Sequence, residues 1–463
     1  MRRSTRRPVS PRFTAWVIVG ALLVAGCGTA ATSSAPPATS IPTPIASPDP
    51  TTSPTPSATA QALAIAMSDV ARDPASIADA RAAAGAINAF GFDLYRAMAA
   101  SGDNVVLSPA SVAIALGMAR TGARGQTASE MDAVLRDVAS DDHAGWLNGL
   151  DQALASRSTT FTDDEGTPHD QTLELANAYF AQRGFDFEPA YLDALAARFG
   201  AGVHTVDYER DAEAARGLIN EWASERTRGR IPAVLQPGDV TAETRLALVN
   251  AIYLKASWAR QFQEDQTVSA PFTRPDGTTV PVPMMRVGQA ACAQGDGWAA
   301  ADIPYLGGEL SMLLIVPDDP STFEAGLDGD RIAEIDAALE ATYAQADVTM
   351  PRFDIETRQE LGDVLAALGM PSALDAERAD FSGMTTAERL FIGKVIHQAN
   401  ISVDEKGTEA AAVTVVGMDT TGGGPSETCT AHADRPFLFA VRDVETGAIL
   451  FMGRVADPSI GRD

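Results

Sequence analysis

The sequence predicts an α+β fold with a large apolar core. Its 463 residues are 45% hydrophobic, which is enough apolar material to exclude a wholly disordered chain. Strand-like runs recur along the chain, and helical patterns lie between many of them. The two do not alternate regularly, as they would in a doubly wound parallel sheet, so the pattern favours α+β over α/β.

The amino terminus is typical of a secretory signal. A positively charged start is followed by an apolar run over 13–24 that is shorter than the roughly 20 residues of a spanning helix, and then by small residues before Cys27. The stretch 23–27 resembles the lipobox of bacterial lipoproteins, in which the cysteine is acylated and becomes the first mature residue. We therefore expect a signal peptide over 1–26 and lipidation at Cys27. An ordinary signal with an incidental cysteine is the alternative.

The next segment, 27–83, is expected to be a stalk. Between 28 and 60 it consists mostly of Ala, Ser, Thr and Pro, a composition that cannot build a core. Such a chain favours extended conformations of about 3.1 Å per residue and could hold a domain on the order of 100 Å from a membrane. Residues 61–83 have a helical composition without an assigned role, and the folded domain is expected over 84–463.

The first elements of that domain follow from local patterns. Apolar residues at Ile87, Phe90, Leu94 and Met98 have helical spacing, so 87–98 predicts an amphipathic helix. Residues 104–109 predict a short strand, and Pro109 can begin the helix over 110–120. Further strands are predicted over 246–254, 310–316, 346–350, 437–441 and 449–455, with a helix over 359–368.

Composition and motifs exclude several function classes. With 35 Lys and Arg against 61 Asp and Glu, the net charge is −26, so no basic field favours nucleic acid. The five histidines form no HExxH pair, and GxSxG, GxxxxGK[ST] and CxxC are absent. No catalytic residue, cofactor or metal site is therefore predicted. Cys292 and Cys429 remain once Cys27 is set aside, either as a disulfide or as two free thiols.

A segment near the carboxyl terminus stands out. From 403 to 424 a strand-like run meets Gly407, continues through small and β-compatible residues, and ends in the glycines of 422–424. Alternate residues from Thr408 onward could face a core, so the stretch could be accommodated inside a sheet. Considered alone, the segment is better interpreted as a surface loop.

Several ordered segments resemble the serpin family, and the resemblance spans residues 84–463. The matching segments are 104–111, 218–222, 227–231, 248–258, 282–285, 395–399, 404–412, 435–437 and 451–455. The resemblance implies a single domain of three β-sheets with surrounding helices and an exposed reactive loop. It also implies a suicide-substrate mechanism, in which a protease cleaves the loop and the freed loop inserts into the central sheet as an extra strand.

The resemblance assigns residues to this mechanism. A polar cluster where the sheet opens would contain Ser108, Ser111, Asn250 and His397, and the place where the loop first enters the sheet would contain Trp258, Arg352 and Glu405. The hinge of the loop would consist of Glu405, Gly407, Thr408, Glu409, Ala410, Ala411 and Ala412. No proline or charge stands at an inward-facing hinge position, which favours an inhibitory member.

The cleaved bond is assigned by counting residues from the hinge, and the target class from the residue types of the loop. Counting from the hinge places the bond between Thr421 and Gly422, with Met418 and Thr420 as lesser candidates. No Lys or Arg stands between Lys406 and Arg435, so a protease with a carboxylate in its specificity pocket has nothing to bind. We expect serine proteases that accept small or apolar residues, as elastase-like and subtilisin-like enzymes do.

The expected partners are therefore proteases, without cofactor or nucleic acid. We expect an exported monomer that touches the membrane only through the lipid anchor, or a secreted one. Alternatives are a non-inhibitory serpin that acts as a surface binding protein, and an inhibitor of papain-like cysteine proteases.

Overall fold

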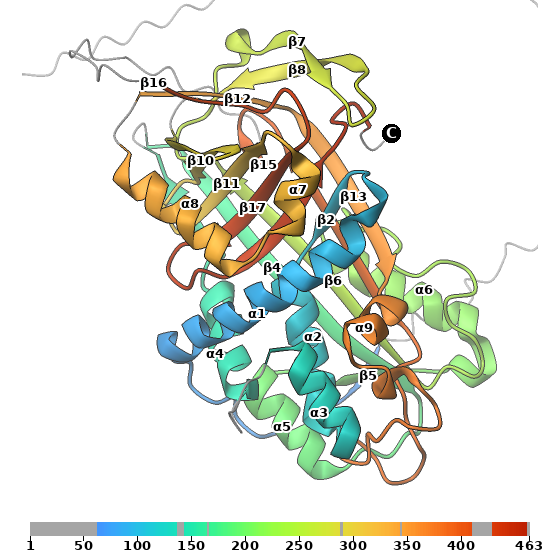
Figure 1. Cartoon of the computed structure of the whole chain (residues 1–463). Helices are drawn as coiled ribbons and strands as arrows, with labels where there is room; N and C mark the ends of the chain where they lie inside the picture. Colours follow the sequence, from blue (N-terminus) through green and yellow to red (C-terminus); the bar gives the residue numbers. More distant parts are fainter. Residues whose placement is uncertain are drawn as a thin grey trace, which may run out of the picture. The chain divides into compact units, whose positions relative to one another are not determined.

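The structure is a computed structural model that describes residues 63–136, 143–163, 166–287, 290–342, 345–409 and 428–460. In this part of the chain the strands form three sheets, and helices surround them (Figure 1). The helices are α1 (Ile77–Met98), α2 (Pro109–Gly122), α3 (Gly125–Val134), α4 (His143–Ala155), α5 (Pro189–Phe199), α6 (Tyr208–Arg226), α7 (Pro320–Ala325), α8 (Gly329–Ala341) and α9 (Gly362–Leu368).

The largest sheet has eight strands and carries the candidate site. Seven of them follow the order β1-β5-β4-β6-β15-β14-β13, and β3 pairs with β4. Of its two long central strands, β6 is mostly apolar and almost completely buried, and β4 is mostly apolar and buried in its second half. The strands are β1 (Ala64–Ala66), β3 (Thr159–Thr162), β4 (Pro168–Gln182), β5 (Val203–Val206), β6 (Leu246–Ser257), β13 (Phe353–Glu360), β14 (Val395–Val403) and β15 (Gly407–Thr408).

The other two sheets have six and four strands. The six-stranded sheet has the order β2 (Val105–Leu107), β18 (Ile449–Val455), β17 (Phe437–Asp443), β11 (Leu310–Pro317), β10 (Trp298–Pro304) and β9 (Ala291–Gly295). The four-stranded sheet has the order β16 (Thr428–His432), β12 (Gln345–Pro351), β8 (Thr279–Arg286) and β7 (Val268–Thr273). In Figure 1 the four-stranded sheet lies at the upper end, and α2 to α5 gather at the lower end.

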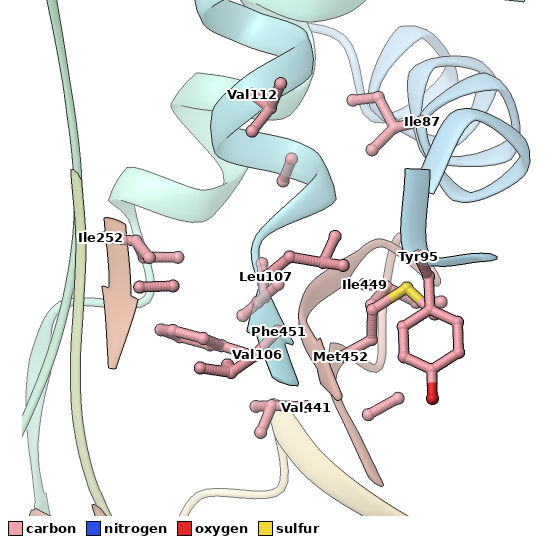
Figure 2. Close-up of a cluster of buried hydrophobic side chains, with 14 of the residues drawn as sticks. Ile87, Tyr95, Val106, Leu107, Val112, Ile252, Val441, Ile449, Phe451 and Met452 are labelled. Atoms are coloured by element: carbon pink, nitrogen blue, oxygen red, sulfur yellow. The ribbon is translucent and has the colours of Figure 1, made fainter. Parts of the chain in front are cut away.

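The main core joins helices to sheets. Figure 2 shows part of it, where side chains of α1, α2, β2, β6, β17 and β18 converge. The loop into α2 shows how local chemistry places an element: the Ser108 side chain accepts a hydrogen bond from the Ser111 backbone N–H, and Pro109 occupies the first turn. Both features are typical of helix starts.

The predicted α+β class with three sheets is confirmed. Two boundaries differ from the sequence patterns. Gln359 and Glu360 finish β13 because they pair with β14, so α9 begins only at Gly362. The segment without an assigned role contributes β1 to the edge of the large sheet and the first turns of α1. Among the described residues, no helix is long and apolar enough to cross a membrane.

Candidate functional site

The candidate site is the seam of the large sheet between β6 and β14. At one end of the seam, β15 lies between these strands: Thr408 pairs with Ala256 of β6 and with Val403 of β14. Farther along, β6 and β14 pair directly in parallel, from Leu248 with Val395 to Ala251 with Gln398. The sheet therefore holds the first two residues of an additional strand at one end of the seam. Direct pairing closes the seam farther along, between residues 248–251 of β6 and 395–398 of β14.

Gly407 begins β15, and only glycine fits there. Its φ is +150°, a region that L side chains rarely adopt, and a Cβ at this position would lie 2.1 Å from the Ala256 carbonyl oxygen. The closeness of β6 therefore requires glycine at this position of the hinge.

The two residues after Gly407 are fixed by side-chain contacts. The Thr408 hydroxyl is buried and lies 2.6 Å from the Tyr305 hydroxyl. Glu409 has a left-handed φ of +49°, and its carboxylate pairs with the Arg230 guanidinium at 2.5 Å. Its backbone N–H donates to the Ser402 carbonyl at 3.1 Å. These contacts hold the described end of the hinge in place.

Trp258 and Arg352 lie together with Glu405, next to the start of β15. The Trp258 indole N–H donates to the Asp404 carbonyl at 2.9 Å, and its ring stacks on Tyr305 with centroids 4.4 Å apart. The Arg352 guanidinium donates to both Glu405 carboxylate oxygens at 2.7 Å, a bidentate pair that fixes orientation.

The Glu405 carboxylate is buried but charged. Burial by itself would raise its pKa, but the hydrogen bonds from Arg352 and from the Thr267 hydroxyl outweigh burial and lower the pKa below its ordinary value. The turn that leads from Glu405 to the hinge is closed by Asp404, whose carboxylate accepts from the Lys406 and Gly407 backbone N–H groups at 2.8 and 3.3 Å.

Ser108, Ser111, Asn250 and His397 also come together, under the closed part of the seam. Strand pairing places His397 opposite Asn250, and the start of α2 brings both serines beneath them. The Asn250 carboxamide lies 2.6 Å from His397 Nδ1 and donates to the Ser111 hydroxyl at 2.5 Å. These contacts link β14, β6 and α2.

The hydrogen bonds of His397 determine its protonation. The Ser108 backbone N–H donates to Nε2 at 3.1 Å, so Nε2 must carry a lone pair, while Nδ1 carries the proton and donates to the Asn250 side-chain oxygen. A second proton, on Nε2, would point at the Ser108 N–H and break this hydrogen bond. The ring is fully buried, and burial lowers the pKa of His397 from 6.5 to about 4.

Asn177 of β4 belongs to the same cluster but was missed by the sequence reasoning. Its side-chain oxygen accepts from Asn250 at 2.5 Å and from the Ser111 hydroxyl at 3.0 Å. A polar residue within the apolar run over 175–181 was the available signal. Tyr305, Thr267 and Arg230, which contact the hinge segment, carried no comparable signal because only the fold brings them there.

The remaining candidate residues lie outside the described residues. These are Cys27, Ala410, Ala411, Ala412, Met418, Thr420, Thr421 and Gly422. Of the two alternatives for Cys292 and Cys429, the structure has the disulfide, with Cα atoms 5.9 Å apart. Within the described ranges, no group of three or more His, Cys, Asp or Glu side chains could hold a metal ion.

Comparisons with known proteins agree with this geometry. Residues 85–458 match the family model described as Serpin (serine protease inhibitor). An uncharacterised serpin-like protein of Thermococcus kodakarensis is 38% identical over 383 residues, covering 81% of this chain and 86% of the relative. The leukocyte elastase inhibitor of Homo sapiens is 32% identical over 381 residues, covering 80% and 97%. The native structure of tengpin, a thermophilic serpin, aligns with a TM-score of 0.73 at 24% identity, covering 85% and 99%.

Proposed function

The chain belongs to the serpin family, and we propose that it is an inhibitory member that traps serine proteases as a suicide substrate. Serpins are mostly protease inhibitors and not catalysts. The proposal goes further and assigns this chain a target class, a cleaved bond and a place outside the cell.

The observation that carries the proposal is the position of β15. Thr408 already pairs with both β6 and β14, and Gly407 pairs with β6. Farther along the seam, β6 and β14 can separate only if their direct pairing is broken. Residues that follow Thr408 can therefore extend an existing strand without having to nucleate one. The polar cluster around His397 bridges the closed seam and must part for this extension, so it sets part of the kinetic barrier.

The chemistry is supplied by the protease. Its serine hydroxyl attacks the carbonyl carbon of Thr421, the bond to the Gly422 nitrogen breaks, and an ester joins the protease to Thr421 while Gly422 leaves as a protonated amine. Insertion of residues 408–421 before water attacks the ester then distorts the protease. Hydrolysis of the ester without insertion would release an active protease and a cleaved chain.

The target class is inferred from the loop and from the relatives. No Lys or Arg stands between Lys406 and Arg435, and several similar proteins are named leukocyte elastase inhibitors. Both observations support proteases whose pockets accept small or apolar side chains. We place the chain outside the cell, anchored through an acylated Cys27, because residues 23–27 resemble a lipobox and the described disulfide suits an oxidising compartment.

The test is incubation with pancreatic elastase, subtilisin and trypsin, followed by denaturing gels. The expected result is a covalent complex with elastase or subtilisin and none with trypsin. Because Cys429 lies after the proposed bond and is bridged to Cys292, the carboxyl-terminal fragment separates only after reduction. Mass analysis of the reduced fragment identifies its first residue, which we expect to be Gly422.

A matched pair of variants tests insertion itself. By alternation from the buried Thr408, Ala410 should face inward and Ala411 outward. Ala410→Arg buries a charge in the sheet and should turn the inhibitor into a substrate, whereas Ala411→Arg should still trap. Cleavage by every protease without a complex, with the wild-type chain, would contradict inhibition and favour the surface binding protein. A complex with papain and none with the serine proteases would move the target to the cysteine class.

Export and lipidation have their own test. Mass analysis of the cell-associated protein should find a chain that begins at an acylated Cys27. Cys27→Ala should release the protein from the membrane fraction or block its processing. An unmodified Cys27 in the mature protein would refute the lipid anchor without affecting the inhibitory proposal.

A further inference from the structure

The disulfide lies directly after the reactive loop and joins two different sheets. Cys429 is the second residue of β16, the edge strand of the four-stranded sheet, and Cys292 belongs to β9, the edge strand of the six-stranded sheet. Next to it, the Gln294 side chain donates to the Thr430 carbonyl at 3.0 Å. Otherwise β16 forms a strand ladder only with β12, from Gln345 with Thr428 to Thr349 with His432, in the described part of the chain.

The four-stranded sheet borders the hinge end of the seam. Arg352, which follows β12 directly, makes the bidentate pair with Glu405, and β16 runs parallel to β12. In Figure 1 β12 and β16 lie toward the upper end of the view, above β4 and β6. A strand that grows from Thr408 along the seam therefore runs away from β16.

The length of the chain limits how far an uncleaved loop can insert into the sheet. A strand over residues 408–421 spans about 44 Å at 3.4 Å per residue, whereas the connection from Thr421 to Thr428 spans at most about 24 Å. An uncleaved chain therefore forms the complete strand only if β16 leaves its sheet and follows the loop. After cleavage between Thr421 and Gly422, this connection is broken and β16 can stay.

We propose that the Cys292–Cys429 disulfide is a lock that prevents the uncleaved chain from inserting its own loop. This inference rests on the proposed function, because the inserted strand is the one used for inhibition. An edge strand with a single ladder is among the easier elements to detach, but a bridge at its second residue holds β16 whether or not the ladder opens. The disulfide therefore prevents insertion of the uncleaved loop but does not hinder insertion after a protease has cleaved the loop.

The consequence is a redox-dependent lifetime of the active state. With the bridge intact, the native chain keeps its loop available until a protease cuts it. With the bridge reduced, β16 can detach, and the chain converts without cleavage into a form with an inserted loop. That form has lost its reactivity toward the protease and has gained a strand, so it should resist heat better than the native chain.

The test uses the full-length chain, folded and oxidised, in a Cys27→Ser background that removes the third thiol. Oxidised and reduced samples are held below the unfolding temperature and followed by intact mass, by thermal unfolding midpoint and by alkylation of Cys429. We expect reduction to speed the conversion by about 30-fold or more, the factor that corresponds to the low end of the usual contribution of a disulfide. The product should be uncleaved and heat-resistant.

Three controls keep the outcome interpretable. Cys292→Ser with Cys429→Ser should convert quickly and be insensitive to reductant, and Gln294→Ala with the bridge intact should convert as slowly as the wild type. A chain already cleaved in its loop should stay heat-resistant when reduced. If the double variant does not fold, reduction of the folded wild type still provides the measurement.

Equal conversion rates in the oxidised and reduced samples would overturn the lock. So would a reduced chain that only unfolds and yields no uncleaved, heat-resistant form. Conversion is scored by mass and thermal midpoint without any protease, so a chain that fails to trap elastase refutes the inhibitory function and leaves the lock open to its own test.

Discussion

Protonation of His397 should weaken the closed sheet in a defined pH window. The neutral ring accepts from the Ser108 N–H and donates to Asn250, and its burial lowers its pKa from 6.5 to about 4. Between pH 6.5 and 4 the unfolded chain therefore binds a proton that the native chain does not. Stability falls as the pH falls through this window, and His397 contributes no further loss below about pH 4.

The two pKa values set the size of the effect. At pH 5 the linkage relation gives a loss of about 2 kcal/mol in the free energy of unfolding relative to pH 7.5, and the complete window amounts to about 3 kcal/mol. The side chain is fully buried, so solvent screening does not reduce this contribution.

The assay is urea unfolding, followed by tryptophan fluorescence at pH 7.5 and pH 5, for the wild type and His397→Gln. The variant should be less stable at pH 7.5 by about 1–3 kcal/mol because it disturbs a buried network, but it should lose the pH dependence that belongs to His397. The pKa of His204 is also lowered, by burial and by Arg226, and this contribution cancels in the comparison. If His397→Gln keeps the full pH dependence of the wild type, the reasoning about His397 is refuted.

Three further substitutions test the hinge. Gly407→Ala should lower stability by at least ~2 kcal/mol through strain and a clash with β6, measured by thermal unfolding; Gly229→Ala, with positive φ in open space, is the control, and an equal loss in both would rule out the clash. Arg352→Ala should lower the free energy of unfolding by about 1–3 kcal/mol because the buried Glu405 loses its partner. This loss should become smaller as acid protonates Glu405, and Arg352→Lys should recover part of it. A loss that does not change with pH would contradict the ion pair. Trp258→Phe keeps the stacking but removes the indole donor, so urea unfolding should show a loss of about 1 kcal/mol; no loss would mean that this hydrogen bond contributes nothing.

Local signals predicted the elements that depend on local chemistry. Ser108 and Pro109 predicted the start of α2, because capping by Ser108 and the fixed φ of Pro109 both act within the first turn of a helix. The run from Leu246 onward predicted β6 because a strand buried on both faces is mostly apolar. The helix predicted over 359–368 was too long at its start, since pairing of β13 with β14 outweighed the helical pattern there.

The candidate site depended on more than local signals. The resemblance to serpins named Asn250 and His397, but their contact requires the parallel register of β6 and β14, which connects residues 147 positions apart. Asn177 was missed for the same reason, because its partners lie on α2 and β6. Tyr305 became part of the hinge only through its contact with Thr408.

By itself the sequence determined the α+β class, the family resemblance, the acidic charge and a reactive loop without Lys or Arg, because composition, periodicity and ordered motifs are properties of the chain. Only the tertiary structure decided that Gly407 and Thr408 already occupy the seam, that His397 is held neutral, and that Cys292 and Cys429 are joined across two sheets. Each of these depends on which distant strands pair and in what register, and that choice is made by packing of the whole core.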